Sequence, residues 1–406
     1  MSQAPLRVAV AGAGAFGKNH LRVYRELEAA GQDSAGLPVA LVAAVEPDAA
    51  RAAETAAKYA IPIFATVNEL LAADLHLDAA SVAVPTVQHH AVASALLDAG
   101  LDLLVEKPLA TNLAEADDLI ARADKGQRIL QPGHLERFNP AVLAIQPQLR
   151  RPMFFEAHRL SIFTPRALDV DVVLDLMIHD LDIVLAFAAS LVHEVRAVGL
   201  PILSPKVDIA NVRVEFESGC VANFTASRVS TERVRKLRFF EPRQYVSIDY
   251  ARQDLLIIKV DADTGKTSPA ELIASLPPQV ASLLPPGIAD GIASGKIDLA
   301  KIDPAVIAQF AAMAKIDPAQ ITQLLAQLTG PRESKRGLSF AKPPVTPGEP
   351  LRLEILSFLE SVRTRREPSV TARQGREALA LALEIQACMA AHAQRAGLDN
   401  FFKPNT

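Results

Sequence analysis

The chain lacks several features that would tie it to particular protein classes. Its 406 residues include only two cysteines, Cys220 and Cys388, which lie far apart and have no spacing typical of a disulfide framework or a structural zinc site. Acidic and basic residues are interspersed and nearly balance at a formal net charge of −4, so there is no electrostatic footprint for nucleic acid. No apolar run is long enough to cross a bilayer, and the first residues show no signal-type segment. We therefore expect a cytoplasmic protein without nucleic-acid or membrane partners.

The length of the chain exceeds that of one ordinary hydrophobic core, so two domains are expected. In residues 1–133, short apolar segments alternate with helical patterns, which is typical of an α/β fold with a doubly wound parallel sheet. Residues 134–406 begin with segments of alternating polarity between 153 and 250, which predict an α+β domain with a large, mostly antiparallel sheet and one polar face.

A glycine-rich segment follows the first predicted strand, residues 6–10, and precedes a helical pattern that runs to about Ala30. Its complete G-x-G-x-x-G fingerprint stands in the strand–loop–helix order of a dinucleotide-binding loop. In chain order, the three glycines would permit a tight turn, close approach of a pyrophosphate and close packing of the helix. The loop residues expected to bind the cofactor are Gly12, Gly14, Ala15, Phe16 and Gly17.

An acidic residue ends the second predicted strand, which covers residues 39–48. Glu46 stands where a carboxylate would accept hydrogen bonds from both ribose hydroxyls of NAD and would disfavour the 2′-phosphate of NADP. It comes later than usual, and we attribute the delay to a loop insertion at residues 31–38. The alternatives are a helix N-cap acid and a solvated turn residue.

The predicted strand at residues 80–85 leads to three further candidates. Pro85 and Thr86 lie at its carboxyl end, the edge at which such sheets bind ligands, and a helix is expected from His89 or His90 to Ala99. Thr86 and His89 are therefore candidates for the cofactor cleft. A helix-capping threonine and a surface histidine are equally consistent with the sequence.

The next predicted strand, residues 102–108, ends in a Glu-Lys-Pro sequence. Glu106 and Lys107 stand at the same carboxyl edge, where the ammonium group of Lys107 could donate to a substrate oxygen and, if partly desolvated, exchange a proton. The alternative for Lys107 is a solvated lysine beside an edge strand.

The segment at residues 174–183 sets Asp175, His179 and Asp182 at spacings of four and three in an apolar background, so a helix would place them on one face. A carboxylate one turn away can orient an imidazole and stabilise its charged form, which predicts a general base. The alternative is a hydrogen-bonded core histidine. A metal site that also uses Asp180 is disfavoured, because no second histidine is suitably spaced.

Four motifs together resemble the Gfo/Idh/MocA family of oxidoreductases. They are AGAGAFG at the first glycine, P-T-x-x-H at 85–89, E-K-P at 106–108 and D-x-x-x-H-x-x-D at 175–182. The resemblance implies an N-terminal NAD-binding Rossmann domain and a C-terminal α/β domain. Carried over by residue, it makes Lys107 a proton-relay or electrostatic residue, Asp175 a substrate-positioning and histidine-orienting acid, and His179 the general base facing the nicotinamide. By the same match Asp182 is structural.

The segments 133–142 and 171–185 are similar to the branch of this family that acts on sugar nucleotides. This resemblance implies oxidation of a UDP-sugar, above all UDP-N-acetylglucosamine, at its C3 hydroxyl, and an aminotransferase that converts the ketone to a 3-amino sugar used in lipid A. It also implies a homodimer or homotetramer formed through the C-terminal sheet. The alternatives are a dehydrogenase for an inositol, a free sugar or a UDP-uronic acid, and a non-catalytic dinucleotide sensor or scaffold.

Several polar residues of the second domain are candidates for the sugar or the diphosphate. Glu136, Arg137 and Asn139 follow a predicted strand at 129–132, and guanidinium groups suit bidentate phosphate contacts. For Arg137 the alternative is an ion pair at the domain junction, and for the strand arginines it is a solvated side chain. The candidate residues of this group are Arg137, Asn139, Arg166, Arg228 and Arg235.

Residues 262–347 depart from the family, which has a short connection here. The segment repeats the sequence KIDPA at 301–305 and 315–319, in a pattern that caps short helices. A peripheral helical insertion is favoured over a lid or an oligomer contact, because no cluster of titratable residues accompanies it. The helical patterns at 349–364 and 376–394 are then expected to pack against the sheet of the second domain.

Overall fold

Two β-sheets organise the protein in a computed structural model that describes residues 4–31, 37–163, 170–260 and 338–398. The chain divides into a large compact unit, residues 1–257 with 341–406, and a smaller one, residues 258–340. The large unit contains the site discussed below. Most of the predicted insertion, including both KIDPA repeats, lies outside the described residues. No described helix is both long and apolar enough to cross a membrane.

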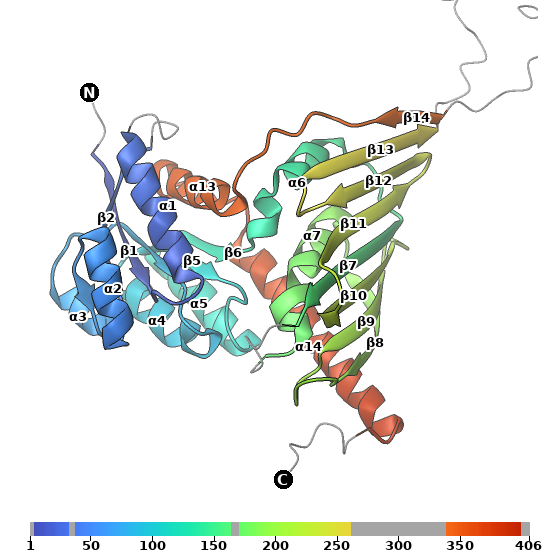
Figure 1. Cartoon of the computed structure of the whole chain (residues 1–406), viewed down its shortest axis with the longest axis horizontal. Coiled ribbons are helices and arrows are strands. Elements are labelled where there is room, and N and C mark those ends of the chain that lie inside the picture. The colour runs from blue at the N-terminus through green and yellow to red at the C-terminus, as the bar shows by residue number, and fades with distance from the viewer. Residues whose placement is uncertain (1–3, 32–36, 164–169, 261–337, 399–406) are drawn as a thin grey trace, which may run out of the picture. The chain divides into compact units, whose positions relative to one another are not determined.

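The N-terminal sheet has six parallel strands in the order β3-β2-β1-β4-β5-β6 (Figure 1). The strands are β1 (Leu6–Ala11), β2 (Val39–Val45), β3 (Ile63–Phe64), β4 (Ala79–Val82), β5 (Asp102–Glu106) and β6 (Leu130–Gly133). The order reverses between β1 and β4, which is the switch point where ligands bind in open α/β sheets. The predicted doubly wound parallel sheet is confirmed.

Helices cover both faces of this sheet (Figure 1). They are α1 (Gly17–Ala30), α2 (Ala49–Tyr59), α3 (Val67–Ala72), α4 (Thr86–Asp98), α5 (Leu113–Gly126) and, from the far end of the chain, α13 (Pro350–Thr364). We expected α13 to pack on the second domain. Instead, Ile355 and Phe358 of α13 are fully buried with Leu21 and Tyr24 of α1 against the first sheet. The sequence does not reveal this contact, because α1 and α13 are more than 300 residues apart. The predicted domain boundary at residue 134 therefore leaves α13 out of the first domain, although it belongs to that core.

The second sheet has eight strands in the order β14-β13-β12-β11-β7-β10-β9-β8. They are β7 (Phe154–Ile162), β8 (Val192–Leu200), β9 (Ile209–Phe216), β10 (Val221–Ser230), β11 (Val234–Glu241), β12 (Gln244–Asp249), β13 (Asp254–Val260) and β14 (Leu338–Ala341). Strands β7 and β10 run parallel, whereas β8–β9, β9–β10, β7–β11 and β11–β12 run antiparallel. The expectation of a large, mostly antiparallel sheet is confirmed.

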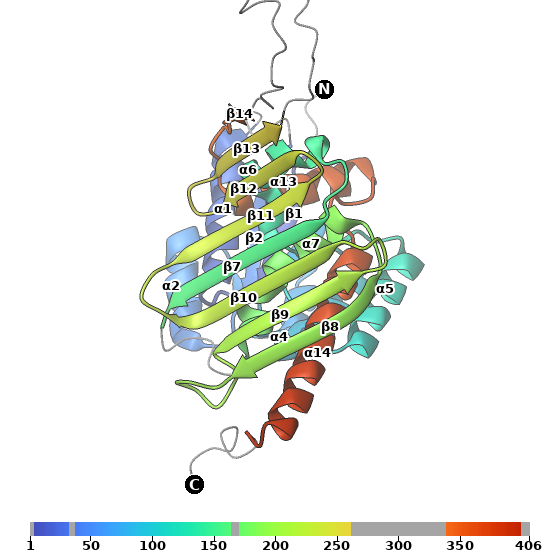
Figure 2. The ribbon, with the colours of Figure 1, turned by 90° about the vertical axis from the view of Figure 1, so that its right-hand side faces the viewer.

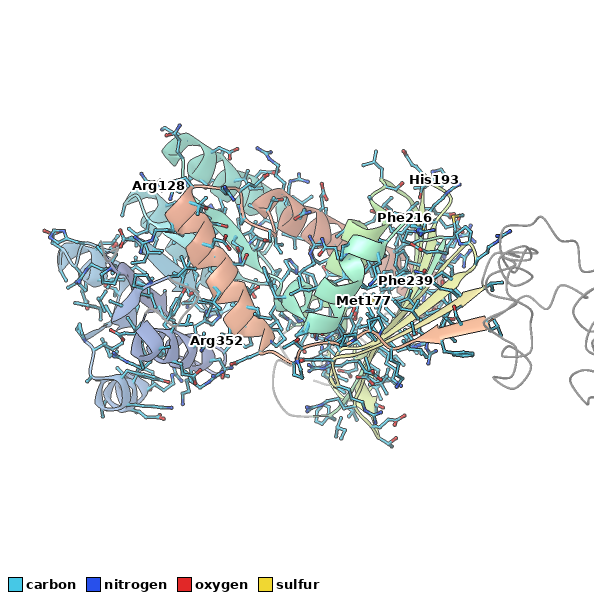
Figure 3. All side chains as sticks on the ribbon, turned by 90° about the horizontal axis from the view of Figure 1, so that it is seen from above. Arg128, Met177, His193, Phe216, Phe239 and Arg352 are labelled. Carbon is cyan, nitrogen blue, oxygen red and sulfur yellow. The ribbon has the colours of Figure 1, made fainter. Side chains whose placement is uncertain are left out.

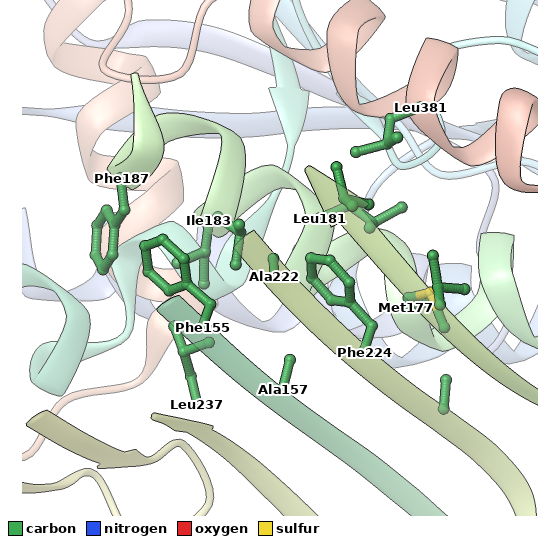
Figure 4. Close-up of a cluster of buried hydrophobic side chains, with 14 of the residues drawn as sticks. Phe155, Ala157, Met177, Leu181, Ile183, Phe187, Ala222, Phe224, Leu237 and Leu381 are labelled. Atoms are coloured by element: carbon green, nitrogen blue, oxygen red, sulfur yellow. The ribbon is translucent and has the colours of Figure 1, made fainter. Parts of the chain in front are cut away.

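The inner face of the second sheet packs against a π-helix, η4 (Val173–Met177), and the helices α7 (Ile178–Ala188) and α14 (Ala372–Arg395). Phe155 of β7 and Phe224 of β10 point from the sheet into this core, where Leu181 and Met177 meet them from the helices (Figure 4). Alternate strand residues therefore supply the apolar side chains that position the η4–α7 segment.

The outer face of the sheet carries a row of aromatic rings beside an ion pair. Figure 2 looks onto it and shows strands β7 to β10 lying in front of the helices. The rings of Phe154, Phe240 and Tyr245 form a row, with centroids 5.6 Å and 5.1 Å apart. An ion pair, Glu156 with Arg238 at 3.8 Å, crosses two neighbouring strands beside the row.

Candidate functional site

The glycine loop between β1 and α1 has the geometry of a pyrophosphate cradle. Gly12 has φ +94°, and a Cβ there would lie 2.7 Å from the carbonyl oxygen of Ala83. A Cβ on Gly17 would collide with Gly12, whereas one on Gly14 would meet nothing within 4 Å. Phe16, the N-cap of α1, makes no side-chain cap, and the backbone N–H groups of Lys18 and Asn19 donate to the carbonyl oxygens of Gly14 and Phe16. The positive end of this 14-residue helix faces the loop and favours an anion there. The loop therefore fits a dinucleotide, as its sequence predicts.

Glu46 lies buried directly after β2 and is held by three donors. The backbone N–H groups of Ala13 and Asp48 donate to it at 3.1 Å and 2.9 Å, and the guanidinium group of Arg51 donates at 3.0 Å. Burial opposes ionisation, but Arg51 and the two amides outweigh it and lower the pKa of Glu46. A carboxylate has about four acceptor positions, so one remains for a ribose hydroxyl. Asp48, not Glu46, caps α2.

The P-T-x-x-H segment forms the start of α4. Helix α4 begins at Thr86, three residues earlier than predicted, with Pro85 as its N-cap. The ring nitrogens of His89 lie 2.8 Å and 2.9 Å from the carbonyl oxygens of Pro108 and Val84. Burial lowers the pKa of His89, and the two contacts oppose that shift. The buried ring joins the two loops that carry these carbonyl groups. The interpretation of His89 as a surface residue is therefore wrong, and its contact with the cofactor stays a prediction.

Glu106 takes part in a buried network. Its Oε1 lies 2.9 Å from Nε2 of His20, whose Nδ1 lies 3.1 Å from the hydroxyl of Ser81. Tyr24 approaches the same hydroxyl at 2.9 Å. Glu106 thereby contacts α1 through His20, and its contact with the cofactor stays a prediction. The sequence analysis missed His20 because its partners lie more than 60 residues away.

Lys107 stands at the end of β5 and reaches the η4 segment. Its Nζ donates to the carbonyl oxygen of Asp175 at 2.6 Å and lies 3.9 Å from the Asp175 carboxylate. Burial lowers the pKa of Lys107, and the charges of Asp175 and Glu106 oppose that shift. A lysine has three donors, and a second one goes to the carbonyl oxygen of Leu174 at 3.4 Å, so the third is shared between the Asp175 carboxylate and a substrate oxygen.

Asp175 and His179 lie one turn apart, but the turn is not α-helical. Residues Val173–Met177 form a π-helix, in which the wider turn changes the alignment of side chains four apart. Among the described residues, His179 makes no hydrogen bond, and its buried Nδ1 has no partner. The predicted bond from Asp175 to His179 is therefore absent. Figure 3 marks this segment at Met177, beside Phe239 of the second sheet.

The environment of His179 favours a neutral imidazole. Burial, together with the positive charges of Lys107 and Arg159, holds the pKa of His179 well below 6.5. Arg235 adds to this effect from β11, where it pairs in register with Arg159. A neutral ring is the form that can accept a proton.

A buried ion network supports the site from β7. Arg159 donates to both carboxylate oxygens of Asp180, at 2.7 Å and 3.0 Å, and to Glu136 at 3.0 Å. Its guanidinium also lies 5.1 Å from the ring centre of Tyr250. The sequence analysis missed Arg159, although its place among the inward residues of an alternating strand was a usable signal. The network orients α7, because Asp180 adjoins His179 in the chain.

The proposed substrate arginines are mostly committed to the protein. Arg137 lies 3.7 Å from Asp182, as the ion-pair alternative for it predicted. Asn139 caps the short helix α6 (Pro140–Ile145) and donates to the carbonyl of Tyr250 at 3.0 Å. Arg228 is buried, and its Nε lies 3.2 Å from Oδ1 of Asp208. The buried charges of the two arginines and the buried amide of Asn139 need these partners, so a substrate role for the three is not supported.

Two further candidates remain. Arg166 lies outside the described residues. Arg235 is half-buried, and its Nε has no partner among the described residues. Burial and the nearby Arg159 lower the pKa of Arg235. In the described part of the chain, no three His, Cys, Asp or Glu side chains are placed to hold a metal ion.

Comparison with known proteins matches these features to one family. Residues 6–134 match the oxidoreductase family with an NAD-binding Rossmann fold, and residues 141–242 match the GFO/IDH/MocA C-terminal domain. The UDP-N-acetylglucosamine 3-dehydrogenase of Acidithiobacillus ferrooxidans is 37% identical over 260 residues, which cover 64% of this chain and 79% of the relative. An inositol 2-dehydrogenase of Acidothermus cellulolyticus is 30% identical over 48% of this chain and 56% of its own length.

A solved structure agrees with the sequence relatives. The UDP-N-acetylglucosamine 3-dehydrogenase from A. ferrooxidans superposes with a TM-score of 0.72 at 28% identity, covering 96% of this chain and 99% of that chain. The glycine loop, the two sheets and the pairing of Lys107 with the η4–α7 segment thus occur in a chain whose relatives are NAD-dependent dehydrogenases. The chain belongs to the Gfo/Idh/MocA family of oxidoreductases and is an NAD-dependent enzyme that acts on CH–OH groups.

Proposed function

We propose that the protein oxidises the C3 hydroxyl of UDP-N-acetylglucosamine to a ketone. The observation that carries this proposal is the meeting of Lys107 with the segment that bears His179, at the carboxyl edge of the NAD-binding sheet. The choice of substrate is supported by the relative that is 37% identical over 79% of its length.

In the proposed mechanism, His179 accepts the proton of the substrate hydroxyl at Nε2. At the same time, hydride leaves the carbon that bears this hydroxyl. NAD⁺, when bound, supplies the hydride acceptor, with its pyrophosphate on the glycine loop and its ribose at Glu46. Lys107 donates to the same oxygen and stabilises the developing alkoxide. Asp175 holds Lys107 in place through its backbone carbonyl and its carboxylate.

For the diphosphate of the substrate, we propose Arg235. It is a strand arginine whose Nε has no partner among the described residues, and its charge lowers the pKa of His179. A planar guanidinium suits bidentate contact with phosphate. Thr86 and Pro85 are proposed to line the cofactor cleft above α4.

A homodimer or homotetramer is proposed through the outer face of the second sheet. The row of Phe154, Phe240 and Tyr245 supports this, because Phe240 is 37% exposed in the isolated chain. Aromatic side chains are enriched in subunit interfaces. We further propose a cytoplasmic enzyme whose ketone product is consumed by an aminotransferase that forms a 3-amino sugar for lipid A.

The test is to incubate the purified protein with NAD⁺ and UDP-N-acetylglucosamine, with a keto-sugar aminotransferase to draw the equilibrium forward. Formation of NADH, with loss of two hydrogens from the sugar nucleotide by mass spectrometry, is the expected result. An inositol or a free sugar oxidised in its place, with no binding of UDP, would replace the substrate by one of the alternatives. If NAD binds but no hydroxyl compound turns over, a sensor becomes the better explanation.

A further inference from the structure

Two buried histidines contact the chain neighbours of Lys107. Nε2 of His20 lies 2.9 Å from Oε1 of Glu106, and Nδ1 of His89 lies 2.8 Å from the carbonyl oxygen of Pro108. His20 is 0% exposed and His89 is 1% exposed. Neither ring takes part in the hydride transfer proposed above, so the two contacts beside Lys107 need another explanation.

A chain of hydrogen bonds ends at the first of these contacts. The hydroxyl of Tyr24 lies 2.9 Å from Oγ of Ser81, which in turn lies 3.1 Å from Nδ1 of His20. Burial raises the pKa of Tyr24, so its hydroxyl keeps its proton and can donate to Ser81. Ser81 then donates to Nδ1 of His20, and Nε2–H of His20 donates to Glu106. The carboxylate of Glu106 is thus the last acceptor of the chain.

The backbone of β6 also confines this carboxylate. Gly133 of β6 pairs in register with Glu106, and a Cβ on Gly133 would lie 2.9 Å from Oε1 of Glu106. A residue without a side chain is therefore needed opposite the carboxylate. His20 and Gly133 together hold the last residue of β5, which directly precedes Lys107.

The second histidine holds the residue that follows Lys107. The ring nitrogens of His89 lie 2.8 Å and 2.9 Å from the carbonyl oxygens of Pro108 and Val84. A neutral imidazole has one N–H, so it donates to one of the two carbonyl groups at a time. The chain after Lys107 is thereby joined to the segment that follows β4.

We propose that His20 and His89 are positioning residues for catalysis, which hold the chain on both sides of Lys107 so that its ammonium group stays at the substrate oxygen. The inference rests on the proposed function, in which Lys107 stabilises the alkoxide. The Nζ of Lys107 also donates to the carbonyl oxygen of Asp175 at 2.6 Å. A shift of the Lys107 backbone would displace this donor, and a misplacement of about 1 Å can cost about a hundredfold in rate.

A role in cofactor binding alone is the rival explanation for His20. Its ring meets the ring of Phe16 edge to face, with centroids 5.6 Å apart. Phe16 belongs to the glycine loop and is 36% exposed. Under this explanation, the loss of His20 would disturb the loop and weaken NAD⁺ binding without affecting Lys107. The binding of NAD⁺ must therefore be measured apart from turnover.

The first test is a double-mutant cycle with Lys107→Met. His20→Leu and His89→Leu should each lower kcat about tenfold in the wild-type background but less than about twofold in Lys107→Met, because they act through Lys107. The dissociation constant of NAD⁺, measured by calorimetry, should stay within about twofold of wild type. His90→Leu, on the surface of α4 and paired with Asp118, is the matched control and should keep the wild-type kcat. An equal loss of kcat in both backgrounds would overturn the proposal, as would weaker NAD⁺ binding with unchanged kcat.

A more conservative pair of variants tests His20 if the leucine variant does not fold. The amide nitrogen of His20→Gln takes the place of Nε2 and reaches Glu106, whereas the shorter side chain of His20→Asn keeps only the contact with Ser81. We expect kcat to be about fivefold lower in His20→Asn than in His20→Gln. Equal values would overturn the role of the Glu106 contact.

A second measurement does not depend on turnover. Hydrogen exchange followed by mass spectrometry should show faster exchange of the amides in residues 105–110 in the His20 and His89 variants, but not in His90→Leu. Unchanged exchange would overturn the proposal. If the wild type oxidises another hydroxyl compound, the choice of sugar nucleotide fails and the cycle is measured on that compound. If it oxidises none, the proposed function fails, while the exchange data still show whether the histidines hold this segment.

Discussion

Lys107 holds Asp175 through the backbone as well as through charge: its ammonium group donates to the Asp175 carbonyl at 2.6 Å and lies 3.9 Å from the carboxylate. The carbonyl belongs to the π-helical turn, where the backbone groups are less regularly paired than in an α-helix. One side chain from the NAD-binding domain thereby fixes the turn that precedes His179. In the proposed mechanism, this contact positions Lys107 and His179 on the same hydroxyl oxygen.

Lys107→Met should lower kcat by about a hundredfold, because the alkoxide loses its charged donor. The binding of NAD⁺, measured by calorimetry, should change little, since the glycine loop is untouched. Lys125→Met, at the exposed end of α5, is the matched control and should keep full activity. Equal kcat for Lys107→Met and the wild type would remove Lys107 from the mechanism.

The pH profile of kcat/KM for oxidation should report His179. The base must be neutral to act, and its pKa lies well below 6.5, so activity should persist at pH 6.5 and fall only at lower pH. Arg235→Met removes one of the charges that lower this pKa, so it should move the acid limb to higher pH. A shift in the opposite direction, or none, would contradict the placement of Arg235 near the base.

The pair of Glu46 and Arg51 should determine whether the enzyme prefers NAD or NADP. Glu46→Ala removes the acceptor for the ribose hydroxyls and releases Arg51, whose guanidinium is 48% exposed and could then meet a 2′-phosphate. We expect the ratio of kcat/KM for NAD over that for NADP to fall at least about tenfold, which corresponds to roughly 1.4 kcal/mol. Arg51→Ala should not improve the use of NADP, and an unchanged ratio in Glu46→Ala would refute the ribose contact.

Loss of the Arg159 network should lower the free energy of unfolding more than it weakens the binding of ligands. Arg159→Met leaves the carboxylates of Asp180 and Glu136 buried without their partner, a change that typically costs about 3–5 kcal/mol. Denaturant unfolding checks this value. Arg196→Met breaks an exposed ion pair with Glu194 on β8 and should cost under about 1 kcal/mol. Similar losses in the two variants would mean that burial adds nothing to the network.

Glu354 on α13 should make stability fall as pH rises. Its side chain is fully buried, both carboxylate oxygens lack a partner among the described residues, and burial raises the pKa of Glu354 well above 4.5, with help from Glu106 and Asp182. The folded state therefore keeps a proton that the unfolded chain loses above about pH 4.5, so stability declines upward from there. Glu354→Gln should unfold at a higher temperature than wild type at pH 8 and at nearly the same temperature as wild type at pH 4.5. An equal gain at both pH values would exclude titration as the cause.

Local patterns in the sequence were sufficient for the scaffold and for the residues at strand ends. The glycine loop, Glu46 and Lys107 sit where short-range order places them, because a strand, a turn and a helix define the carboxyl edge of a parallel sheet. The partners of buried polar groups were not predictable in this way. His20 with Glu106 and Arg228 with Asp208 join residues whose pairing depends on the packing of the whole domain. The π-turn was also hidden, because D-x-x-x-H spacing is the same in both kinds of helix.

Because of that π-turn, the chemistry of the site depends on the exact number of codons in this segment. A π-helical turn holds one residue more than an α-helical one, so the deletion of a single codon between 173 and 177 would restore an ordinary turn. Every residue before the deletion would then rotate by about 100° around the helix axis relative to His179. If the codon lost were that of Leu176 or Met177, the Asp175 carbonyl that holds Lys107 would point elsewhere, although no residue named in the mechanism had been replaced. Among related genes, the length of this helix is thus as informative as the identity of its histidine.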